Sequence, residues 1–331
     1  MAGELDRWAA ARDLVVRETV ALVIELGDKK EVDMHIFVTG ATGWVGSAVV
    51  NELIAAGHQV VGLARSDKGA KALTAAGAEV QRGSLSDLEM LKRAASDADG
   101  VIHLAFGIDF TKIVEMAEED RQAIEAFGEV YAGSNRPVIV TSGFGFLPPG
   151  ETFIEEMPAA PLMPGFPRAS EQTAFAIASK GARATWVRLP RSVHGVGERH
   201  GFVPMLAGIA QEKGVSAYVG EGQNLWPSVH RIDAARLYRL ALEQGAQGGP
   251  FHAVADEGVP FRQIAEAISE QLGVPTKSIT PEEAAEHFGL LAMFISGNGP
   301  ASSAQTRERL GWMPEQPGLI RDINRPEYFR T

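Results

Sequence analysis

The stretch Thr39-Gly40-Ala41-Thr42-Gly43-Trp44-Val45-Gly46 decides the fold of this chain. It follows residues 34–38, a short apolar run typical of a buried strand, and it leads into residues 44–56, whose apolar side chains recur at helical spacing. Three glycines alone occur often by chance, so their context carries the information. A strand, a glycine-rich turn and a helix in this order predict the first unit of a dinucleotide-binding domain.

Each glycine of this turn has its own physical task. Gly40 permits the tight turn, Gly43 lets backbone amides approach a pyrophosphate, and Gly46 lets the helix pack closely on the sheet. The N-terminus of the helix adds partial positive charge. The alternative is a structural turn that has lost its ligand. The residues of this turn predicted to contact the cofactor are Gly40, Thr42, Gly43, Trp44, Val45 and Gly46.

The alternation of strand and helix continues to about residue 190. Further strands are predicted at residues 59–63, 79–81, 101–104, 137–140 and 185–189, and a further helix at residues 68–76. Strands that alternate with helices in one direction form a parallel sheet covered on both faces. The predicted fold class is therefore α/β, a doubly wound parallel Rossmann-type sheet with a smaller C-terminal substrate-binding lobe.

The chain divides into three predicted parts. Residues 1–33 form an N-terminal helical extension, residues 34–190 the NAD(P)-binding Rossmann domain, and residues 191–331 mostly the C-terminal lobe, with some segments returning to the sheet. Prolines concentrated in residues 148–167 disfavour helix and strand, and predict a long ordered loop or lid after the fifth strand. In the C-terminal lobe, helices are predicted near residues 202–213, 232–244, 260–272 and 281–288.

The residue at the end of the second strand selects the cofactor. A carboxylate there would hold the ribose hydroxyls of NAD, but the sequence has Arg65 at this place. The Arg65 guanidinium suits a 2′-phosphate, Ser66 adds a hydroxyl donor, and Lys68 adds positive charge nearby. Asp67 favours the opposite interpretation if the strand ends one or two residues later. The pattern as a whole favours NADP(H) over NAD(H).

Composition excludes several other classes of function. The 331 residues carry a formal net charge of −11, which disfavours binding to nucleic acid or an anionic membrane and leaves a small-molecule substrate as the expected partner. The sequence has no Cys, which excludes disulfides and thiolate nucleophiles and fits a reducing compartment. No apolar run approaches the roughly 18 residues of a membrane span, and the N-terminus lacks the cationic start of a secretory signal. We therefore expect a cytoplasmic protein.

Two groups of titratable residues have simple structural interpretations. His194, His200 and His230 match no compact metal-ligand motif, so no metal site is predicted. A run of acidic residues is expected to form the solvated face of a helix: Glu115, Glu118, Glu119 and Asp120.

Several short motifs follow the glycine turn in a fixed order. They are Gly83-Ser84-Leu85-Ser86-Asp87, His103-Leu104-Ala105, Thr141-Ser142-Gly143, Arg188-Leu189-Pro190 with Val193-His194-Gly195, Val229-His230-Arg231-Ile232-Asp233-Ala234-Ala235, and Leu310-Gly311-Trp312-Met313-Pro314. With the TGxxGxxG turn, they resemble the extended branch of the short-chain dehydrogenase/reductase superfamily, which contains NAD(P)-dependent epimerases, dehydratases and reductases. The resemblance implies further cofactor contacts at Ser84, Leu85, Leu104, Ala105, Thr141, Pro190 and Val193. Dimers are common in this family, which makes a homodimer one candidate assembly, although the sequence does not reveal the oligomeric state.

One departure from the family is serious. Its members usually carry YxxxK, in which Tyr transfers a proton and Lys lowers the pKa of that Tyr. None of the 4 Tyr of this chain has Lys four residues later. At the interval usual in the family, Gly143 is followed by Arg168, so Arg168 replaces Tyr and Gln172 replaces Lys, as in atypical members. Gly143 then occupies the place of the catalytic Ser, with Ser142 and Thr141 as neighbours.

Without the dyad, other residues must serve a carbonyl reduction, which needs a hydride, a group that stabilises the alkoxide, and a proton source. Arg168 can hold an oxyanion but is a poor acid, because its guanidinium stays protonated. The proton then comes from Ser142, His194, Glu171 or water, and His194 titrates in the suitable range. The simpler interpretation of Glu171 is an ion pair with Arg168 on one helix face.

These residues support three hypotheses. The leading one is an NADP-dependent oxidoreductase with a pocket between the lid at residues 148–167 and the C-terminal lobe. Trp226 and Phe202 either line this pocket or pack in the core of the lobe. A redox-neutral sugar epimerase or isomerase would use the same fold, but it usually needs the missing Tyr. A non-catalytic NADP(H)-binding sensor or scaffold is favoured by the missing dyad.

Overall fold

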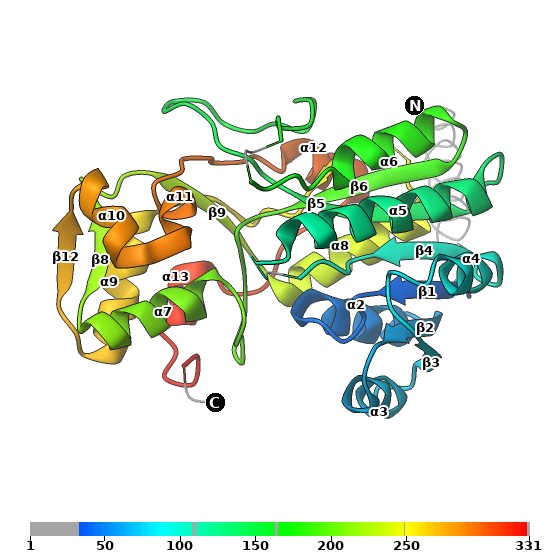
Figure 1. The fold of residues 1–331 in the computed structure, drawn as a ribbon, viewed down its shortest axis with the longest axis horizontal. Coiled ribbons are helices and arrows are strands. Elements are labelled where there is room, and N and C mark those ends of the chain that lie inside the picture. Colours follow the sequence, from blue (N-terminus) through cyan, green and yellow to red (C-terminus); the bar gives the residue numbers. More distant parts are fainter. Residues whose placement is uncertain (1–32, 108, 110, 163–164, 248, 330–331) are drawn as a thin grey trace, which may run out of the picture. The chain divides into compact units, whose positions relative to one another are not determined.

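A seven-stranded parallel sheet forms the centre of the fold (Figure 1). Its strands are β1 (His35–Thr39), β2 (Gln59–Ala64), β3 (Glu79–Arg82), β4 (Gly100–His103), β5 (Pro137–Gly143), β6 (Arg183–Leu189) and β10 (Phe251–His252). In the computed structural model, which describes residues 33–329 except 108, 110, 163, 164 and 248, the strand order is β10-β6-β5-β4-β1-β2-β3. The order runs outward from β1 in both directions, and each neighbouring pair is parallel. The predicted doubly wound fold class is confirmed.

Helices cover both faces of this sheet. They are α2 (Trp44–Ala55), α3 (Asp67–Ala75), α4 (Leu88–Ser96), α5 (Ile113–Tyr131), α6 (Ser170–Ser179), α8 (Arg231–Glu243) and α12 (Ala304–Leu310). Strand side chains alternate between the two faces. Ile36 and Val38 of β1 therefore join the hydrophobic core beneath α2 and α8, whereas Phe37 joins the core beneath α4, α5 and α6.

Two smaller sheets follow β6. Strands β7 (Ser192–His194), β9 (Leu225–His230) and β11 (Asp256–Pro260) form one, in which β9 is parallel to β7 and antiparallel to β11. Strands β8 (Ser216–Val219) and β12 (Thr276–Ile279) form a parallel pair. The remaining helices are α7 (Phe202–Lys213), α9 (Phe261–Leu272), α10 (Pro281–Phe288), η1 (Gly289–Leu291), α11 (Ala292–Ile295) and α13 (Leu319–Ile323).

The four helices predicted in the C-terminal part correspond to α7, α8, α9 and α10. A third hydrophobic core, which includes Trp226 and Phe261, lies among α7, α9 and the small sheets. Residues after β9 also reach the large sheet, since α8 packs on α2 and β10 pairs with β6. The division of the chain at residues 33 and 190 stays a prediction.

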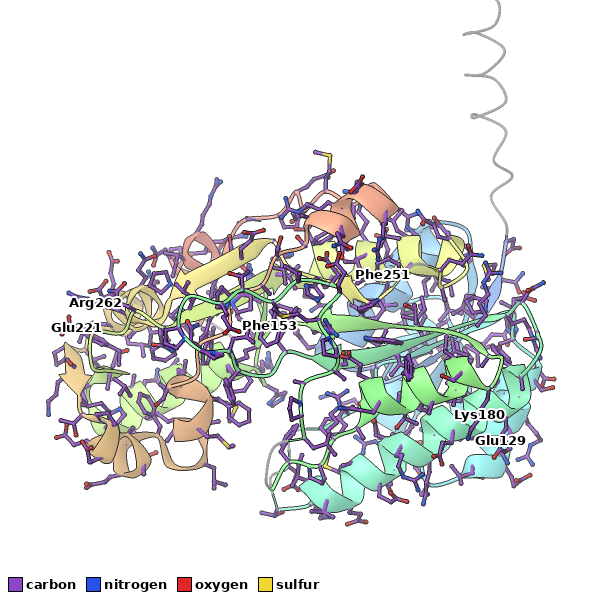
Figure 2. All side chains as sticks on the ribbon, turned by 90° about the horizontal axis from the view of Figure 1, so that it is seen from above. Glu129, Phe153, Lys180, Glu221, Phe251 and Arg262 are labelled. Atoms are coloured by element: carbon purple, nitrogen blue, oxygen red, sulfur yellow. The ribbon has the colours of Figure 1, made fainter. Side chains whose placement is uncertain are left out.

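The proline-rich segment is a loop. Residues 144–169 join β5 to α6 and contain neither helix nor strand among those that the structure describes. Residues 298–301 hold this loop, because the Leu147 amide donates to the Asn298 carbonyl at 2.9 Å and Phe153 forms a parallel bridge with Ala301. Figure 2 shows Phe153 on this loop and Phe251 on β10.

Two sequence predictions concern the remaining parts of the chain. The predicted helix over residues 1–33 falls outside the described residues, apart from Asp33. Among the helices that the structure describes, none has the length and apolar character needed to cross a lipid bilayer.

Candidate functional site

The glycine turn is sterically restricted by backbone on both sides. Gly40 has φ +66°, and a Cβ on it would lie 2.7 Å from the Ala105 amide nitrogen. A Cβ on Gly46 would lie 2.0 Å from the Gly40 carbonyl oxygen. Gly43 is the N-cap of α2 and supplies no side-chain cap, which leaves the first amides of the helix for an anion. The turn is thus a cradle that only glycine can form, and it fits a dinucleotide pyrophosphate.

Trp44 connects this turn to the segment after β6. Its indole Nε1 donates to the Val193 carbonyl at 2.6 Å. The Arg231 guanidinium carbon lies 4.0 Å from the centroid of the Trp44 ring, and Arg231 Nη2 donates to Ser47 Oγ at 2.9 Å. The structure therefore brings the predicted residues Trp44 and Val193 together. It adds Arg231 as a cation near the pyrophosphate cradle, which the sequence motif around His230 contained but did not single out.

Arg65 follows the end of β2, the place that the sequence analysis predicted for it. β2 ends at Ala64, so Arg65 is the first residue after the strand, and it is exposed. Asp67 is the first residue of α3, and its carboxylate accepts from Arg82 Nη2 at 2.6 Å. Ser66 caps α3 by accepting from the Gly69 amide at 3.1 Å. The strand boundary therefore places Arg65, and not Asp67, directly after β2.

The other predicted cofactor contacts lie at neighbouring strand ends. The Leu104 and Ala105 amides donate to Thr39 Oγ1 at 3.2 and 3.3 Å, which holds the segment after β4 against β1. Ser84 and Leu85 follow β3, and Ser84 Oγ lies 2.8 Å from Ser86 Oγ. Pro190 follows β6 directly, and Thr141 lies within β5. All are at or beyond the carboxyl ends of parallel strands, where open α/β sheets bind their ligands.

A buried network of hydrogen-bonded side chains begins at the end of β1. Thr39 Oγ1 lies 2.7 Å from His103 Nδ1, and His103 Nε2 lies 3.2 Å from Asp120 Oδ1. Because a carboxylate only accepts hydrogen bonds, His103 Nε2 is the donor to Asp120. Burial alone would raise the pKa of Asp120, but hydrogen bonds from His103 and Ser170 and the charge of Arg168 lower it overall. The expectation of a solvated acidic face is wrong for Asp120, which is fully buried.

Arg168 is the last member of this hydrogen-bond network, and it lies against β5. Its Nε donates to Ser170 Oγ at 2.8 Å, and Ser170 Oγ donates to Asp120 Oδ2 at 2.7 Å. Arg168 Nη2 donates to the Thr141 carbonyl at 2.8 Å, and its guanidinium carbon lies 3.8 Å from the centroid of the Phe106 ring. Within the described part of the chain, Nη1 makes no hydrogen bond. Arg168 therefore presents one donor that is free to bind another group at the end of β5.

The expected ion pair between Arg168 and Glu171 is not formed. α6 begins at Ser170, so Arg168 precedes the helix and the helical i,i+3 geometry does not apply. Gln172, which takes the place of the family's Lys, donates through Nε2 to the Ala160 carbonyl in the loop at 3.0 Å.

Glu171 instead pairs with Arg188 of β6. Arg188 Nη2 donates to Glu171 Oε1 at 2.5 Å and Nε donates to Oε2 at 3.0 Å, and both side chains are buried. Ser142 Oγ donates to Glu171 Oε2 at 3.2 Å. Arg188 also donates to the Met157 carbonyl in the loop at 2.6 Å and to His252 Nε2 at 3.1 Å. The predicted residues Ser142 and Glu171 thus meet, but in an ion-paired network.

Tyr238 reaches the same strand end from α8. Its hydroxyl lies 2.7 Å from Thr141 Oγ1. Burial raises the pKa of Tyr238, whereas the hydrogen bond to Thr141 and the charge of Arg168 lower it. The sequence did not select Tyr238 because Lys does not follow it at the family's spacing. The sequence placed Asp120 on a solvated face and Arg188 only within a motif, because the partners His103 and Glu171 are each 17 residues away.

His194 belongs to a different cluster. Its Nδ1 lies 2.9 Å from Asp322 Oδ2, its ring centroid is 5.5 Å from that of His230, and its Nε2 has no hydrogen-bond partner among the described residues. None of its contacts is with Ser142, Arg168 or Glu171. The four predicted catalytic residues therefore fall into three separate settings: the free Arg168 donor, the Ser142–Glu171 network and the buried His194.

The cluster around His194 also contains a buried acid with an unusual pKa. Burial raises the pKa of Glu198 from 4.5 to about 8, against the hydrogen bond that the Tyr328 hydroxyl donates to Glu198 Oε2 at 2.5 Å. The pKa of Glu198 is higher in the folded protein than in the unfolded one, so the folded state binds the Glu198 proton more tightly. The stability that this proton binding adds is complete below pH 4.5 and is lost as the pH rises to 8.

Replacing Glu198 with Gln should remove that pH dependence. In the wild type, Glu198 should lower the free energy of unfolding by about 1.4 kcal/mol for each pH unit inside this window. Urea unfolding at a series of pH values between 5 and 8 measures both slopes, and the difference isolates Glu198 from the histidines. Equal slopes in the two proteins would mean that Glu198 is ionised when folded.

Two further expectations concern metal ions and the packing of Trp226. Among the described residues, no group of His, Asp and Glu is arranged to hold a metal ion. Trp226 is fully buried and packs edge-on against Phe202 at 5.5 Å between centroids, which supports core packing for this pair.

Both the sequence and the fold are similar to those of known proteins. Residues 36–254 match the model of the NAD dependent epimerase/dehydratase family. An uncharacterized protein of Schizosaccharomyces pombe is 47% identical over 296 residues, which cover 89% of this chain and 100% of that protein. An uncharacterized protein of Saccharomyces cerevisiae is 46% identical over 292 residues, covering 88% and 98%. The solved UDP-glucose 4-epimerase of Thermus thermophilus, in complex with NAD, has a similar fold, with a TM-score of 0.67 and 21% identity over 88% of this chain and 97% of that one.

Proposed function

The chain belongs to the NAD-dependent epimerase/dehydratase family, and on this premise we propose that it is an NADP(H)-dependent oxidoreductase acting on a carbonyl or alcohol of small or medium size. The observation that carries the proposal is Arg65, an exposed cation directly after β2 where NAD-binding members need a carboxylate. A preference for NADP(H) fits net reduction of a substrate better than a redox-neutral reaction, in which the coenzyme is restored within each turnover.

The residues of the glycine turn fit the pyrophosphate of such a coenzyme, as the tight approach of Gly46 to Gly40 indicates. Arg65 would hold the 2′-phosphate and Arg231 would add charge near the pyrophosphate. The bound coenzyme supplies the hydride for the reduction.

Arg168 is the residue that we assign to the substrate oxygen. Its free Nη1 can donate to the oxygen as negative charge develops there, and its other nitrogens are held by Ser170 and Thr141, so little reorganisation is needed. Glu171 is occupied by Arg188, and His194 by Asp322. The proton that completes the alcohol is therefore assigned to water.

A second candidate is a sugar epimerase. It is favoured by relatives such as the UDP-glucose 4-epimerase of Streptococcus mutans, which is 28% identical over 85% of this chain and 92% of that protein. The missing YxxxK argues against it, because this chemistry depends on the Tyr. Incubation with NADPH and a carbonyl panel, and separately with UDP-sugars, distinguishes the two. A third outcome, coenzyme binding without any turnover, would favour a sensor.

Replacing Arg65 with Ser tests the cofactor assignment. The variant should bind NADPH about 10- to 100-fold more weakly, because a charge-assisted contact to the 2′-phosphate is lost. Its affinity for NADH should stay unchanged, since NADH has no such phosphate. Isothermal titration calorimetry with both coenzymes measures the effect.

The matched control is Arg93→Ser, which removes an exposed arginine from α4. It should alter neither affinity. A wild-type protein that binds NADH as tightly as NADPH would contradict the assignment of Arg65.

A further inference from the structure

Arg191 is a buried cation that pairs with no carboxylate of the described residues. It lies between β6 and β7, where its Nη2 donates to the Gly145 carbonyl at 2.7 Å. Its Nη1 is buried and has no hydrogen-bond partner in the part of the chain that the structure describes. Burial lowers the pKa of Arg191 to about 10, so the side chain still carries its charge at neutral pH. An unpaired buried charge is costly, and its retention suggests a ligand that pairs with it.

Two aromatic rings lie beside this guanidinium. Its carbon lies 4.5 Å from the ring centroid of Phe146 and 5.6 Å from that of Trp226. Gly145 and Phe146 belong to the loop after β5, so Arg191 lies beyond the same carboxyl edge of the sheet at which Arg168 meets Thr141. One cation in an apolar setting, with one free Nη donor, matches a single negative charge better than a phosphate dianion.

A row of rings connects Arg191 to Arg168. The centroid distances are 6.1 Å from Phe146 to Phe294, 6.3 Å from Phe294 to Phe166 and 6.2 Å from Phe166 to Phe106. Phe106 lies under the Arg168 guanidinium at 3.8 Å. The rings come from the loops after β4 and β5 and from α11. An apolar row thus has a guanidinium with a free donor at each of its ends.

We propose that Arg191 binds the carboxylate of the substrate, and that the substrate is an aromatic or otherwise apolar oxo acid or hydroxy acid. Its apolar body lies along the phenylalanine row, and its reacting oxygen lies at Arg168. The inference rests on the proposed oxidoreductase function and names the substrate class of that same site. The Arg191 contact fixes the orientation of the substrate and takes no part in the hydride transfer.

Equilibrium binding tests the proposal without requiring turnover. 10-Oxodecanoate and its methyl ester carry the reacting carbonyl and the carboxyl group at opposite ends of an apolar chain, and only the acid is charged, so they are titrated into the full-length protein saturated with NADP⁺. The wild type should bind the acid about 10- to 100-fold more tightly than the ester, as expected for one charge-assisted contact. Arg191→Met should lose this preference while its affinity for the ester changes little, and Arg191→Lys should keep part of it.

Arg262→Met is the matched control. Arg262, which is labelled in Figure 2, also stacks on an aromatic ring, Tyr218, at 5.4 Å, but it is exposed and paired with Glu266 at 2.7 Å. This variant should keep the preference for the acid. The comparison of acid with ester in the wild type does not depend on the folding of any variant, and Arg191→Lys tests the assignment with a side chain that keeps the charge.

The possible failures are distinguishable. Equal affinity of the wild type for acid and ester, or an unchanged preference in folded Arg191→Met, overturns the assignment of Arg191. If the acid binds selectively through Arg191 but NADPH is not oxidised with any carbonyl of the panel, the anion site stands and the proposed oxidoreductase function fails. If NADPH is oxidised equally well with acid and ester, the function stands and the substrate class is wrong.

Discussion

Replacing Arg188 with Met is expected to lower the free energy of unfolding by about 3–5 kcal/mol, because the change leaves the buried Glu171 carboxylate without its counter-charge. Two hydrogen bonds to Glu171 are lost, at 2.5 and 3.0 Å. The Met157 carbonyl and His252 Nε2 also lose their donor. Burial lowers the pKa of His252, which disfavours a positive charge on this ring in place of the missing one. Urea unfolding followed by far-UV circular dichroism measures the effect.

Two further variants separate the buried charge from the loss of contacts. Arg188→Met combined with Glu171→Leu should recover most of the stability, because no unpaired charge remains in the core. Arg121→Met removes an arginine that makes ion pairs with Glu118 and Glu125 on the half-exposed surface of α5, and it should cost at most about 1 kcal/mol. If Arg188→Met is no more harmful than Arg121→Met, the buried pair contributes little.

The fold could be predicted because its signals are local in the sequence. The glycine turn requires glycine at Gly40 and Gly46 for steric reasons that hold wherever this turn occurs. The buried parallel strands appear as short apolar runs, since both of their faces are covered. The helices of the C-terminal part, such as α7 and α10, show apolar spacing of their own, so their positions also follow from the sequence.

The candidate site was predictable only in part. Arg65 and Arg168 were found because each occupies a fixed distance from a motif. Their partners were not, since contact across the fold brings together residues that are far apart, as with Thr141 of β5 and Tyr238 of α8. Asp120 was misjudged because a run of acidic residues resembles a solvated face, and sequence does not reveal that one of them turns inward to His103.

The phenylalanine row could not be predicted from the sequence either. Phe106, Phe166 and Phe294 lie in separate segments, and nothing in their spacing indicates that their rings meet. Arg191 stands next to a recognised motif, but only the structure shows that a carboxylate is lacking around it in the described part of the chain. A residue's missing partner is a property of three-dimensional packing.

Arg168→Met should lower kcat/KM for carbonyl reduction by about 100- to 1000-fold, the effect expected when one preorganised oxyanion donor is removed. The affinity for NADPH should change little, because Arg168 lies at the end of β5 and away from Arg65. Initial rates of NADPH oxidation, with coenzyme affinity measured separately by calorimetry, test both statements. Arg168→Lys should retain part of the rate, since it keeps the positive charge but not the planar geometry.

Arg136→Met provides the matched control for this loss. Arg136 also lies over an aromatic ring, Tyr131, at 4.2 Å and donates to the Ala98 carbonyl at 3.0 Å, but it precedes β5 at the amino end of the sheet. Its replacement removes the same kind of contacts and should leave kcat/KM unchanged. A folded Arg168→Met variant that keeps wild-type kcat/KM would show that the substrate oxygen is held elsewhere, and Tyr238 and Thr141 would then be the next residues to replace.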